Sequence, residues 1–204
     1  NKEKKDIERF TLSEQQENAI NQIDLNTNKT YLLHGVTGSG KTEVYMQLIE
    51  KTIKNNKTAI MLVPEISLTT QIVNRFYDRF GPEVAIFHSA LSDGERFDEY
   101  LKILRNEVKI VVGTRSAIFT PLNDLGLIIL DEEHSENYKQ DSNPRYHATD
   151  MADYRAKYHN IPLILGSATP SLESMARAQK GVYEYVEMTK RIGTSTLPTI
   201  KIID

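Results

Sequence analysis

The stretch from residue 35 to residue 42, Gly-Val-Thr-Gly-Ser-Gly-Lys-Thr, constrains the fold of this chain more than any other feature. It has the form G-x-x-x-x-G-K-[ST], and it lies between a largely apolar run at 31–34 and a segment with helical apolar spacing that continues to residue 55. A strand, a glycine-rich loop and a helix in this order are the setting of a phosphate-binding P-loop. Glycines let the loop turn its N–H groups inward, and the helix directs its positive N-terminal end at the same point. The stretch therefore predicts a nucleotide-binding domain.

The residue types within this loop have specific chemical uses. The ammonium group of Lys41 can reach the β- and γ-phosphates of a nucleotide, and the hydroxyl of Thr42 can ligate Mg²⁺. We expect the other members of the loop to surround the phosphates; they are Gly35, Thr37, Gly38, Ser39 and Gly40.

A second motif, Leu-Ile-Ile-Leu-Asp-Glu at residues 127–132, is an apolar strand that ends in two carboxylates, the Walker B pattern. We expect Asp131 to hold Mg²⁺ and Glu132 to act as the general base that polarises the attacking water. The alternative is an acidic helix N-terminus after a strand, which is stabilising in itself. The P-loop upstream favours the catalytic interpretation.

Strands alternate with helices along the chain, which predicts an α/β domain with a mainly parallel sheet. We expect strands at 30–33, 58–63, 84–87, 108–112, 125–130, 162–165 and 183–188. Helices are expected after capping boxes at Ser13 and Ser92, after the P-loop, and over 67–80, 150–159 and 171–180, with a loop over 135–149. The polar clusters at 35–42, 131–134 and 166–170 each follow a strand, so they should meet at one edge of the sheet and form one site.

Composition narrows the class of protein. The chain has 204 residues, a length that suits one domain. Its formal net charge is -3, so any contact with nucleic acid must come from a local part of its surface. It has no cysteine, which excludes disulfides and cysteine-ligated zinc within the chain. No apolar run approaches the ~18 residues of a membrane span, and residues 1–6 lack the apolar core of a signal peptide. We therefore expect a cytoplasmic protein with no membrane partner, cut from a longer chain.

The motifs together resemble those of the superfamily 2 helicases. Asp-Glu-Glu-His at 131–134 resembles their motif II, and the P-loop at 35–42 resembles their motif I. Three further stretches resemble motif Ia (63–69), motif Ib (112–116) and motif III (166–170). From residue 12 to residue 174 the chain is most similar to the PriA family of bacterial primosomal replication-restart DNA helicases. The match corresponds to the first of the two helicase lobes.

The resemblance implies a three-layer RecA-like P-loop NTPase domain over residues 10–190, with linkers at 1–9 and 191–204. It implies ATP and Mg²⁺ as cofactors, and 3′-to-5′ DNA unwinding in replication restart and primosome assembly. The implied partners are forked or single-stranded DNA, the second lobe and other domains of the same protein, and primosome and single-strand-binding proteins. Zinc is expected only in parts of the full protein outside this chain. The alternatives are another superfamily 2 translocase, RecG-like or restriction-type, and a nucleotide-regulated binding module without turnover, against which Glu132 argues.

The resemblance also implies roles for single residues. His134 and the stretch Gly166, Ser167, Ala168 and Thr169 should couple the state of the γ-phosphate to DNA contacts. Gln16 should recognise adenine, because an amide can pair with both the N6 donor and the N7 acceptor. The alternative role of Gln16 is the capping-box partner of Ser13, and the two roles are compatible.

Two groups of residues are predicted to sense DNA. After the acidic motif, aromatic and basic side chains can stack on unpaired bases and bind phosphate, although a solvated loop is the simpler interpretation. These residues are Tyr138, Lys139, Arg145 and Tyr146. The motifs that follow strands near 63 and 112 could hold a nucleic-acid backbone, although ordinary helix capping is the alternative there. They contain Thr69, Thr114, Arg115 and Ser116.

Overall fold

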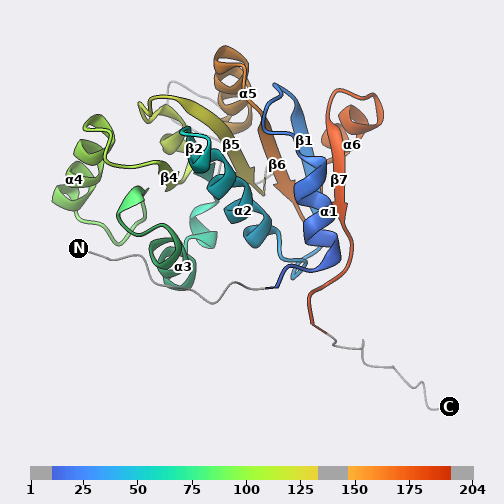
Figure 1. Cartoon of the computed structure of the whole chain (residues 1–204), viewed down its shortest axis with the longest axis horizontal. Helices are drawn as coiled ribbons and strands as arrows, with labels where there is room; N and C mark the ends of the chain where they lie inside the picture. Colours follow the sequence, from blue (N-terminus) through green and yellow to red (C-terminus); the bar gives the residue numbers. More distant parts are fainter. Residues whose placement is uncertain (1–10, 133–146, 194–204) are drawn as a thin grey trace.

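The computed structural model describes residues 11–132 and 147–193, which form one sheet covered by helices on both faces (Figure 1). The strands are β1 (Thr30–Gly35), β2 (Thr58–Leu62), β3 (Val84–Ile86), β4 (Ile110–Gly113), β5 (Leu125–Asp131), β6 (Leu163–Ser167) and β7 (Glu184–Met188). The α-helices are α1 (Glu14–Gln22), α2 (Lys41–Lys54), α3 (Thr70–Phe80), α4 (Asp93–Leu104), α5 (Ala148–His159) and α6 (Leu172–Gln179). Short 3₁₀ helices are η1 (Glu65–Ser67), η2 (Gly81–Glu83) and η3 (Arg115–Phe119). The predicted α/β class is confirmed.

The strand order of the sheet is β3-β4-β2-β5-β6-β1-β7, and every neighbouring pair is parallel. Strand β6 therefore separates β1, which leads into the P-loop, from β5, which leads to the acidic motif. The register places His34 beside Ser167 and Asp131 beside Gly166. The carboxyl ends of these three central strands thus meet at one edge, as the spacing of polar clusters predicts.

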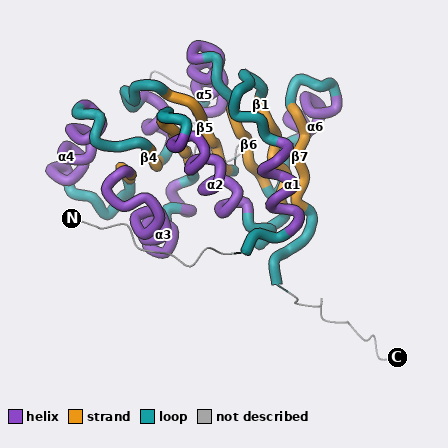
Figure 2. The backbone as a smooth tube through the Cα atoms, viewed as in Figure 1, coloured by secondary structure: helices purple, strands orange, loops and turns teal. Residues whose placement is uncertain are grey.

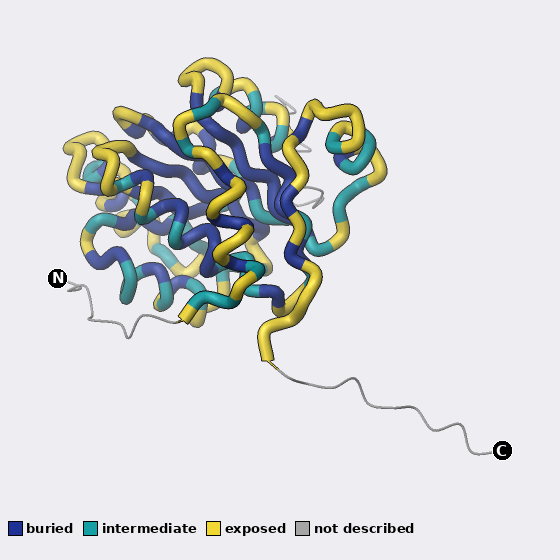
Figure 3. The backbone as a smooth tube through the Cα atoms, turned by 45° about the vertical axis from the view of Figure 1, so that its right-hand side comes forward, coloured by how far each residue is buried: buried dark blue, intermediate teal, exposed yellow. Residues whose placement is uncertain are grey.

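Successive strand residues point to opposite faces of the sheet and form two separate cores. Leu33 and Ile129 belong to the core beneath α1, α2 and α3, whereas Leu32 and Ile128 belong to the core beneath α4, η3 and α5. Figure 2 shows the strands in orange between purple helices, and Figure 3 shows most of their backbone in the dark blue of buried residues. Burial on both faces explains why β2 to β6 are largely apolar runs, whereas the edge strand β7 alternates between exposed and buried residues.

Side-chain caps mark the starts of α1, α3, α4 and α6, whereas α2 and α5 start without one. Both predicted capping boxes are present, Ser13 with Gln16 at α1 and Ser92 with Glu95 at α4. The helix predicted from residue 67 starts later, at Thr70, because residues 65–67 form the separate helix η1 and the Thr69 hydroxyl caps α3. The helix predicted from residue 150 starts earlier, at Ala148, so the predicted loop before it is two residues shorter at this end.

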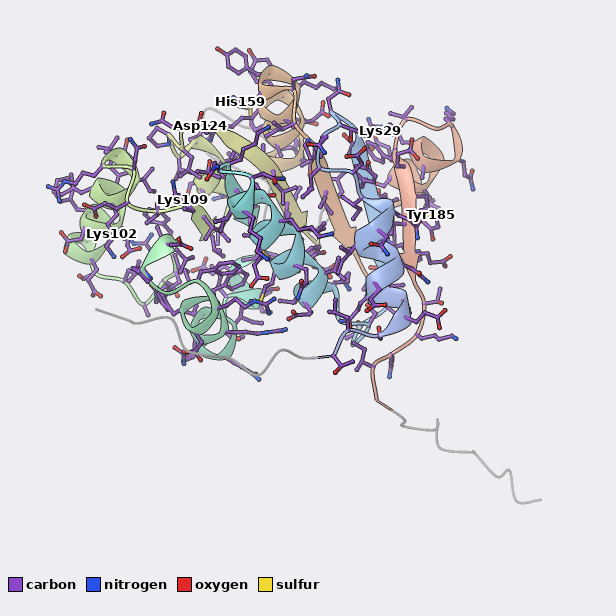
Figure 4. The ribbon with its side chains drawn as sticks, viewed as in Figure 1. Lys29, Lys102, Lys109, Asp124, His159 and Tyr185 are labelled. Atoms are coloured by element: carbon purple, nitrogen blue, oxygen red, sulfur yellow. The ribbon has the colours of Figure 1, made fainter. Side chains whose placement is uncertain are left out.

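Strand β7 is tied to its neighbour β1 by side chains as well as by backbone pairing. The hydroxyl of Tyr185 lies 2.7 Å from Nδ1 of His34, and Lys29 lies 3.6 Å from a carboxylate oxygen of Glu184 (Figure 4). Within the ranges 11–132 and 147–193, no helix combines the length and the apolar content that a membrane crossing requires.

Candidate active site

A cavity of about 410 Å³ opens where the carboxyl ends of β1 and β5 meet the start of α2. It is lined by residues 37–42 of the P-loop, together with Thr11, Gln16, Glu43, Arg75, Asp131, Glu132 and Ile192. The volume lies in the range of small-ligand and cofactor sites, roughly 300–1,000 Å³. The fold thus brings the P-loop, the two carboxylates and Gln16 to one cavity.

The backbone of the P-loop depends on its glycines. Gly38 and Gly40 have φ angles of 80° and 85°, in the left-handed region that residues with a Cβ rarely adopt. The turn between them is closed by the Ser39 N–H, which donates to the carbonyl of Val36 at 2.9 Å. Helix α2 starts directly after Gly40, so its N-terminal end faces the cavity.

The residues of the loop fit a phosphate group. The hydroxyl of Ser39 is buried and has no hydrogen-bond partner within the described part of the chain, although it lies in the cavity lining. The ammonium group of Lys41 donates to the Gly35 carbonyl at 2.5 Å, so the lysine is folded over its own loop. A phosphate would provide acceptors for the hydroxyl, the ammonium group and the inward N–H groups.

The residues that line the cavity also fit a magnesium ion that would be coordinated by both the protein and the nucleotide. Thr42 and Asp131 both line the cavity, and no cluster of three or more His, Cys, Asp or Glu that could hold a metal occurs in the part of the chain that the structure describes. Mg²⁺ is usually bound through one or two carboxylates, substrate phosphates and water rather than by an all-protein cage. The donor set here is of that kind.

Asp131 is the last residue of β5, and its carboxylate accepts a hydrogen bond of 2.7 Å from the Tyr45 hydroxyl. Burial raises the pKa of Asp131 above its ordinary value; the Tyr45 bond lowers it, the neighbouring Glu132 carboxylate raises it, and Lys41 lowers it. A cation in the cavity would favour the ionised form of Asp131, because a nearby positive charge stabilises a buried carboxylate.

Glu132 has a strained backbone. Its φ angle is 51°, and the other non-glycine residues with positive φ within the described ranges are all Asn or Asp, namely Asn56, Asn106, Asp124 and Asn160. Those residue types tolerate the left-handed conformation, whereas for glutamate it costs roughly 1–2 kcal/mol. Such strain persists at functional sites where the surrounding structure holds it.

Gln16 has the capping role and a second contact that the sequence does not reveal. Its Oε1 accepts from the Ser13 N–H at 2.8 Å, and its Nε2 donates to the carbonyl of Gly40 at 3.2 Å. The side chain is buried against the loop. An amide has two N–H groups and two acceptor lone pairs, so these bonds leave one donor and one acceptor for a base.

Four residues that line the cavity belong to no sequence motif, so the sequence analysis did not identify them. Glu43 directly follows the P-loop and accepts from Arg75 Nη2 and Arg79 Nη1, each at 2.8 Å. The N–H of Ile192 donates to the Gly38 carbonyl at 2.8 Å, which brings a segment predicted as linker against the P-loop. Arg75 and Thr11 reach the cavity only through the packing of α3 and of the segment before α1.

The remaining predicted residues lie around this edge or outside the described ranges. Ser167 ends β6 fully buried, and its hydroxyl accepts from the Thr169 N–H at 3.0 Å. Thr69 caps α3, which agrees with helix capping, the alternative to a nucleic-acid contact. The Thr114 side chain makes no capping bond to η3. Arg115 and the exposed Ser116 begin η3, and Ala168 lies between Ser167 and Thr169. The predicted residues outside the described ranges are His134, Tyr138, Lys139, Arg145 and Tyr146.

Comparison with known proteins identifies the family. A family model described as DEAD/DEAH box helicase matches residues 13–178. The chain belongs to the DEAD/DEAH box helicase family. Its similarity to PriA, expected from the motifs, is confirmed by curated relatives named Replication restart protein PriA. The relative from Bacillus subtilis is 54% identical over 98% of this chain and 25% of its own length. The relative from Haemophilus influenzae is 47% identical over 96% of this chain and 27% of its own length.

This DEAD/DEAH box helicase chain therefore spans about a quarter of the length of those relatives. Solved structures agree with the fold. RecG bound to a three-way DNA junction matches with a TM-score of 0.64 and 23% identity, over 92% of this chain and 25% of that one. The Hef helicase domain of Pyrococcus furiosus matches with a TM-score of 0.59 and 22% identity, over 85% of this chain and 37% of that one. The predicted RecA-like helicase fold is confirmed.

Proposed function

We propose that this chain is the ATP-binding lobe of an ATP-dependent DNA helicase that acts in replication restart and primosome assembly, with 3′-to-5′ polarity. The observation that carries the proposal is the meeting of three motifs at adjoining strand ends, with Asp131 beside Gly166 and the P-loop on the next strand. The similarity to Replication restart protein PriA supports DNA as the substrate.

In this proposal the chain's own residues bind and orient the nucleotide. The P-loop N–H groups and Lys41 hold the phosphates, while Thr42 and Asp131 hold Mg²⁺. When bound, Mg²⁺ neutralises charge on the phosphate oxygens. Glu132 takes a proton from the attacking water, and the free donor and acceptor of Gln16 pair with adenine.

The same edge provides a route from nucleotide to DNA. Gly166 and Ser167 end β6, the strand beside β5, and Ala168 and Thr169 follow it, so a shift of the acidic motif would act directly on this stretch. We assign the coupling role to this stretch and to His134. We assign DNA contacts to the strand-end residues Thr69, Thr114, Arg115 and Ser116, and to Tyr138, Lys139, Arg145 and Tyr146.

We further propose that residues 10–190 form the lobe, and that 1–9 and 191–204 link it to the rest of the protein. The proposed partners are forked or single-stranded DNA, a second helicase lobe and other domains of the same protein, and primosome and single-strand-binding proteins. Zinc would belong to those other domains, since this chain has no cysteine. The proposed location is the cytoplasm.

The alternative of another superfamily 2 translocase fits the RecG likeness, which at 23% identity concerns the fold alone. The identity of 54% to a PriA relative favours the replication-restart assignment. A binding module without turnover would have no use for a strained, cavity-lining carboxylate at Glu132.

The test uses the full-length protein and two variants. Lys41→Ala should weaken nucleotide binding, because it removes the cation that faces the phosphates. Glu132→Gln should retain binding and lose most hydrolysis, because it removes only the base. Both are measured by ATP binding and by ATP hydrolysis with and without forked DNA. The proposal would be contradicted if Glu132→Gln hydrolysed ATP at the parental rate. It would also be contradicted if forked DNA did not change the rate of ATP hydrolysis by the parental protein.

A further inference from the structure

Tyr45 is a core residue of the helix that follows the P-loop, and it contacts the acidic motif. It is the fifth residue of α2, three residues after Thr42, and its side chain is fully buried. Its hydroxyl does not face solvent but donates to the Asp131 carboxylate at 2.7 Å, across 86 residues of sequence. A buried tyrosine needs a partner for its O–H, and here the partner is a carboxylate of the proposed metal site.

A glycine makes room for this contact. A Cβ built on Gly166 would collide with the Tyr45 hydroxyl, and it would lie 2.8 Å from Cζ of the ring and 3.1 Å from Oδ1 of Asp131. Gly166 lies beside Asp131 in the parallel pair of β5 and β6. Three elements, α2, β5 and β6, therefore converge on one hydrogen bond, and each belongs to a different motif of the site.

We propose that Tyr45 is a positioning residue that orients the Asp131 carboxylate for Mg²⁺, and that Gly166 is glycine because this bond requires the space. The inference rests on the proposed function, since it assumes that the cavity binds a nucleotide with Mg²⁺. The bond restricts the rotation of the carboxyl group. Because Tyr45 lies near the start of the helix that begins with Lys41 and Thr42, the bond ties the carboxylate to the helix that carries the phosphate-binding residues.

The choice of tyrosine is consistent with this role. A hydroxyl donor is neutral, so it orients the carboxylate and leaves its negative charge for the cation. A lysine or arginine in the same place would neutralise that charge and compete with the metal. The hydrogen-bond partners of metal-ligating groups commonly change metal affinity by about 10–100-fold when they are removed.

The decisive experiment is a Mg²⁺ titration of nucleotide binding. Binding of a fluorescent ATP analogue is measured for the protein and for Tyr45→Phe, first in EDTA and then with increasing Mg²⁺. Tyr45→Phe keeps the ring, so binding in EDTA should be unchanged. The Mg²⁺ concentration that gives half of the Mg²⁺-dependent effect should rise about 10-fold or more.

A matched control is Tyr31→Phe. Tyr31 is also buried, and its hydroxyl accepts from the Asp24 N–H at 3.1 Å, at the opposite end of β1 from the P-loop. This variant should leave the Mg²⁺ titration unchanged. An equal shift in both variants, or no shift in Tyr45→Phe, would overturn the inference. Failure of the parental protein to bind the analogue would instead overturn the proposed function.

A second measurement does not depend on nucleotide. Gly166→Ala should lower the thermal stability of the parental protein, because the new methyl group meets the Tyr45 hydroxyl. In the Tyr45→Phe background the loss should be smaller, because the closest colliding atom is gone. Substitutions of contacting residues are expected to be non-additive in this way. If Gly166→Ala lowered the thermal stability equally in both backgrounds, the Tyr45 hydroxyl would not occupy the space beside Gly166. That result would contradict the inference.

Discussion

Replacing Glu43 with glutamine should destabilise the fold in a pH-dependent manner. Glu43 is the third residue of α2, and its side chain is only 7% exposed. Its carboxylate accepts from Gln47 Nε2 at 3.0 Å as well as from Arg75 and Arg79 on α3 at 2.8 Å. The carboxylate thus joins the P-loop helix to the next helix of the same layer, which lies beside it in Figure 1.

The magnitude follows from what the substitution leaves behind. Removing one partner of a buried ion pair typically costs about 3–5 kcal/mol. The cost here should be lower, because Arg79 retains Glu50 at 2.6 Å and the Arg75 side chain is 38% exposed. Glutamine also retains one carbonyl acceptor, so we expect a loss of about 2–3 kcal/mol. In a domain of this size that corresponds to a fall in Tm of about 4–12 °C.

The pH dependence has a definite sign. Burial raises the pKa of Glu43, but the bonds from Gln47 and Arg79 outweigh it, and the pKa falls below the ordinary value of 4.5. The ionised carboxylate therefore stabilises the folded state above about pH 4.5, and this contribution is lost as the pH falls through the lower folded-state pKa. Glutamine does not titrate, so the difference between parent and variant should shrink on acidification.

Urea unfolding followed by circular dichroism, from neutral to acidic pH, measures this difference. The control is Glu173→Gln, whose partner Arg177 lies at 2.7 Å but whose side chain is 73% exposed. Exposed pairs contribute little, so the control should change stability by less than about 0.5 kcal/mol. A Glu43→Gln loss as small as that of the control, or a loss that stays constant or grows on acidification, would refute the argument.

Three further variants test separate parts of the protein. Gly40→Ala should abolish nucleotide binding, measured with a fluorescent analogue, because its φ is 85° and a Cβ would strike the Gln16 amide; parental affinity would contradict the P-loop geometry. Ser92→Ala should lower the free energy of unfolding by about 1 kcal/mol, because it removes the cap of α4, and no loss in urea unfolding would rule out a stabilising cap. Tyr138→Ala combined with Tyr146→Ala should spare basal ATPase of the full-length protein and reduce its stimulation by DNA, since stacking contributes roughly 1–3 kcal/mol per base; equal loss of both rates would indicate packing instead.

The sequence predicts the parts of this site whose residue type is dictated by the backbone or by the ligand. Glycines at 38 and 40 are needed for left-handed turns, and an apolar strand followed by Asp131 is recognisable because both signals are local. The alternation of elements predicts the α/β class for the same reason. The order of strands in the sheet has no such local signal, because it depends on pairings between distant segments.

Individual side-chain contacts between helices and strands are not predicted by the sequence, although the meeting of the strand-end motifs at one edge is. Tyr45 has the spacing of an ordinary core residue on α2, and only the fold reveals the carboxylate at its hydroxyl. Arg75 and Glu43 are 32 residues apart, on helices whose packing no periodicity specifies. The helix starts at 70 and 148 differ from the predicted ones because apolar spacing marks a helical face but not the residue that caps it.

The missed contacts both come from the N-terminal end of α2, and this explains how the strained backbone of the site is held. Residues two apart on a helix lie about 200° apart around its axis, so Glu43 and Tyr45 face different neighbours. Glu43 bonds to α3, Tyr45 bonds to the end of β5, and Thr42 remains on the cavity. The strand pairing with β6 and the Tyr45 hydroxyl thus both hold Asp131 in place. The left-handed Glu132 follows directly, and a residue can be held in that conformation only where the chain before it cannot relax.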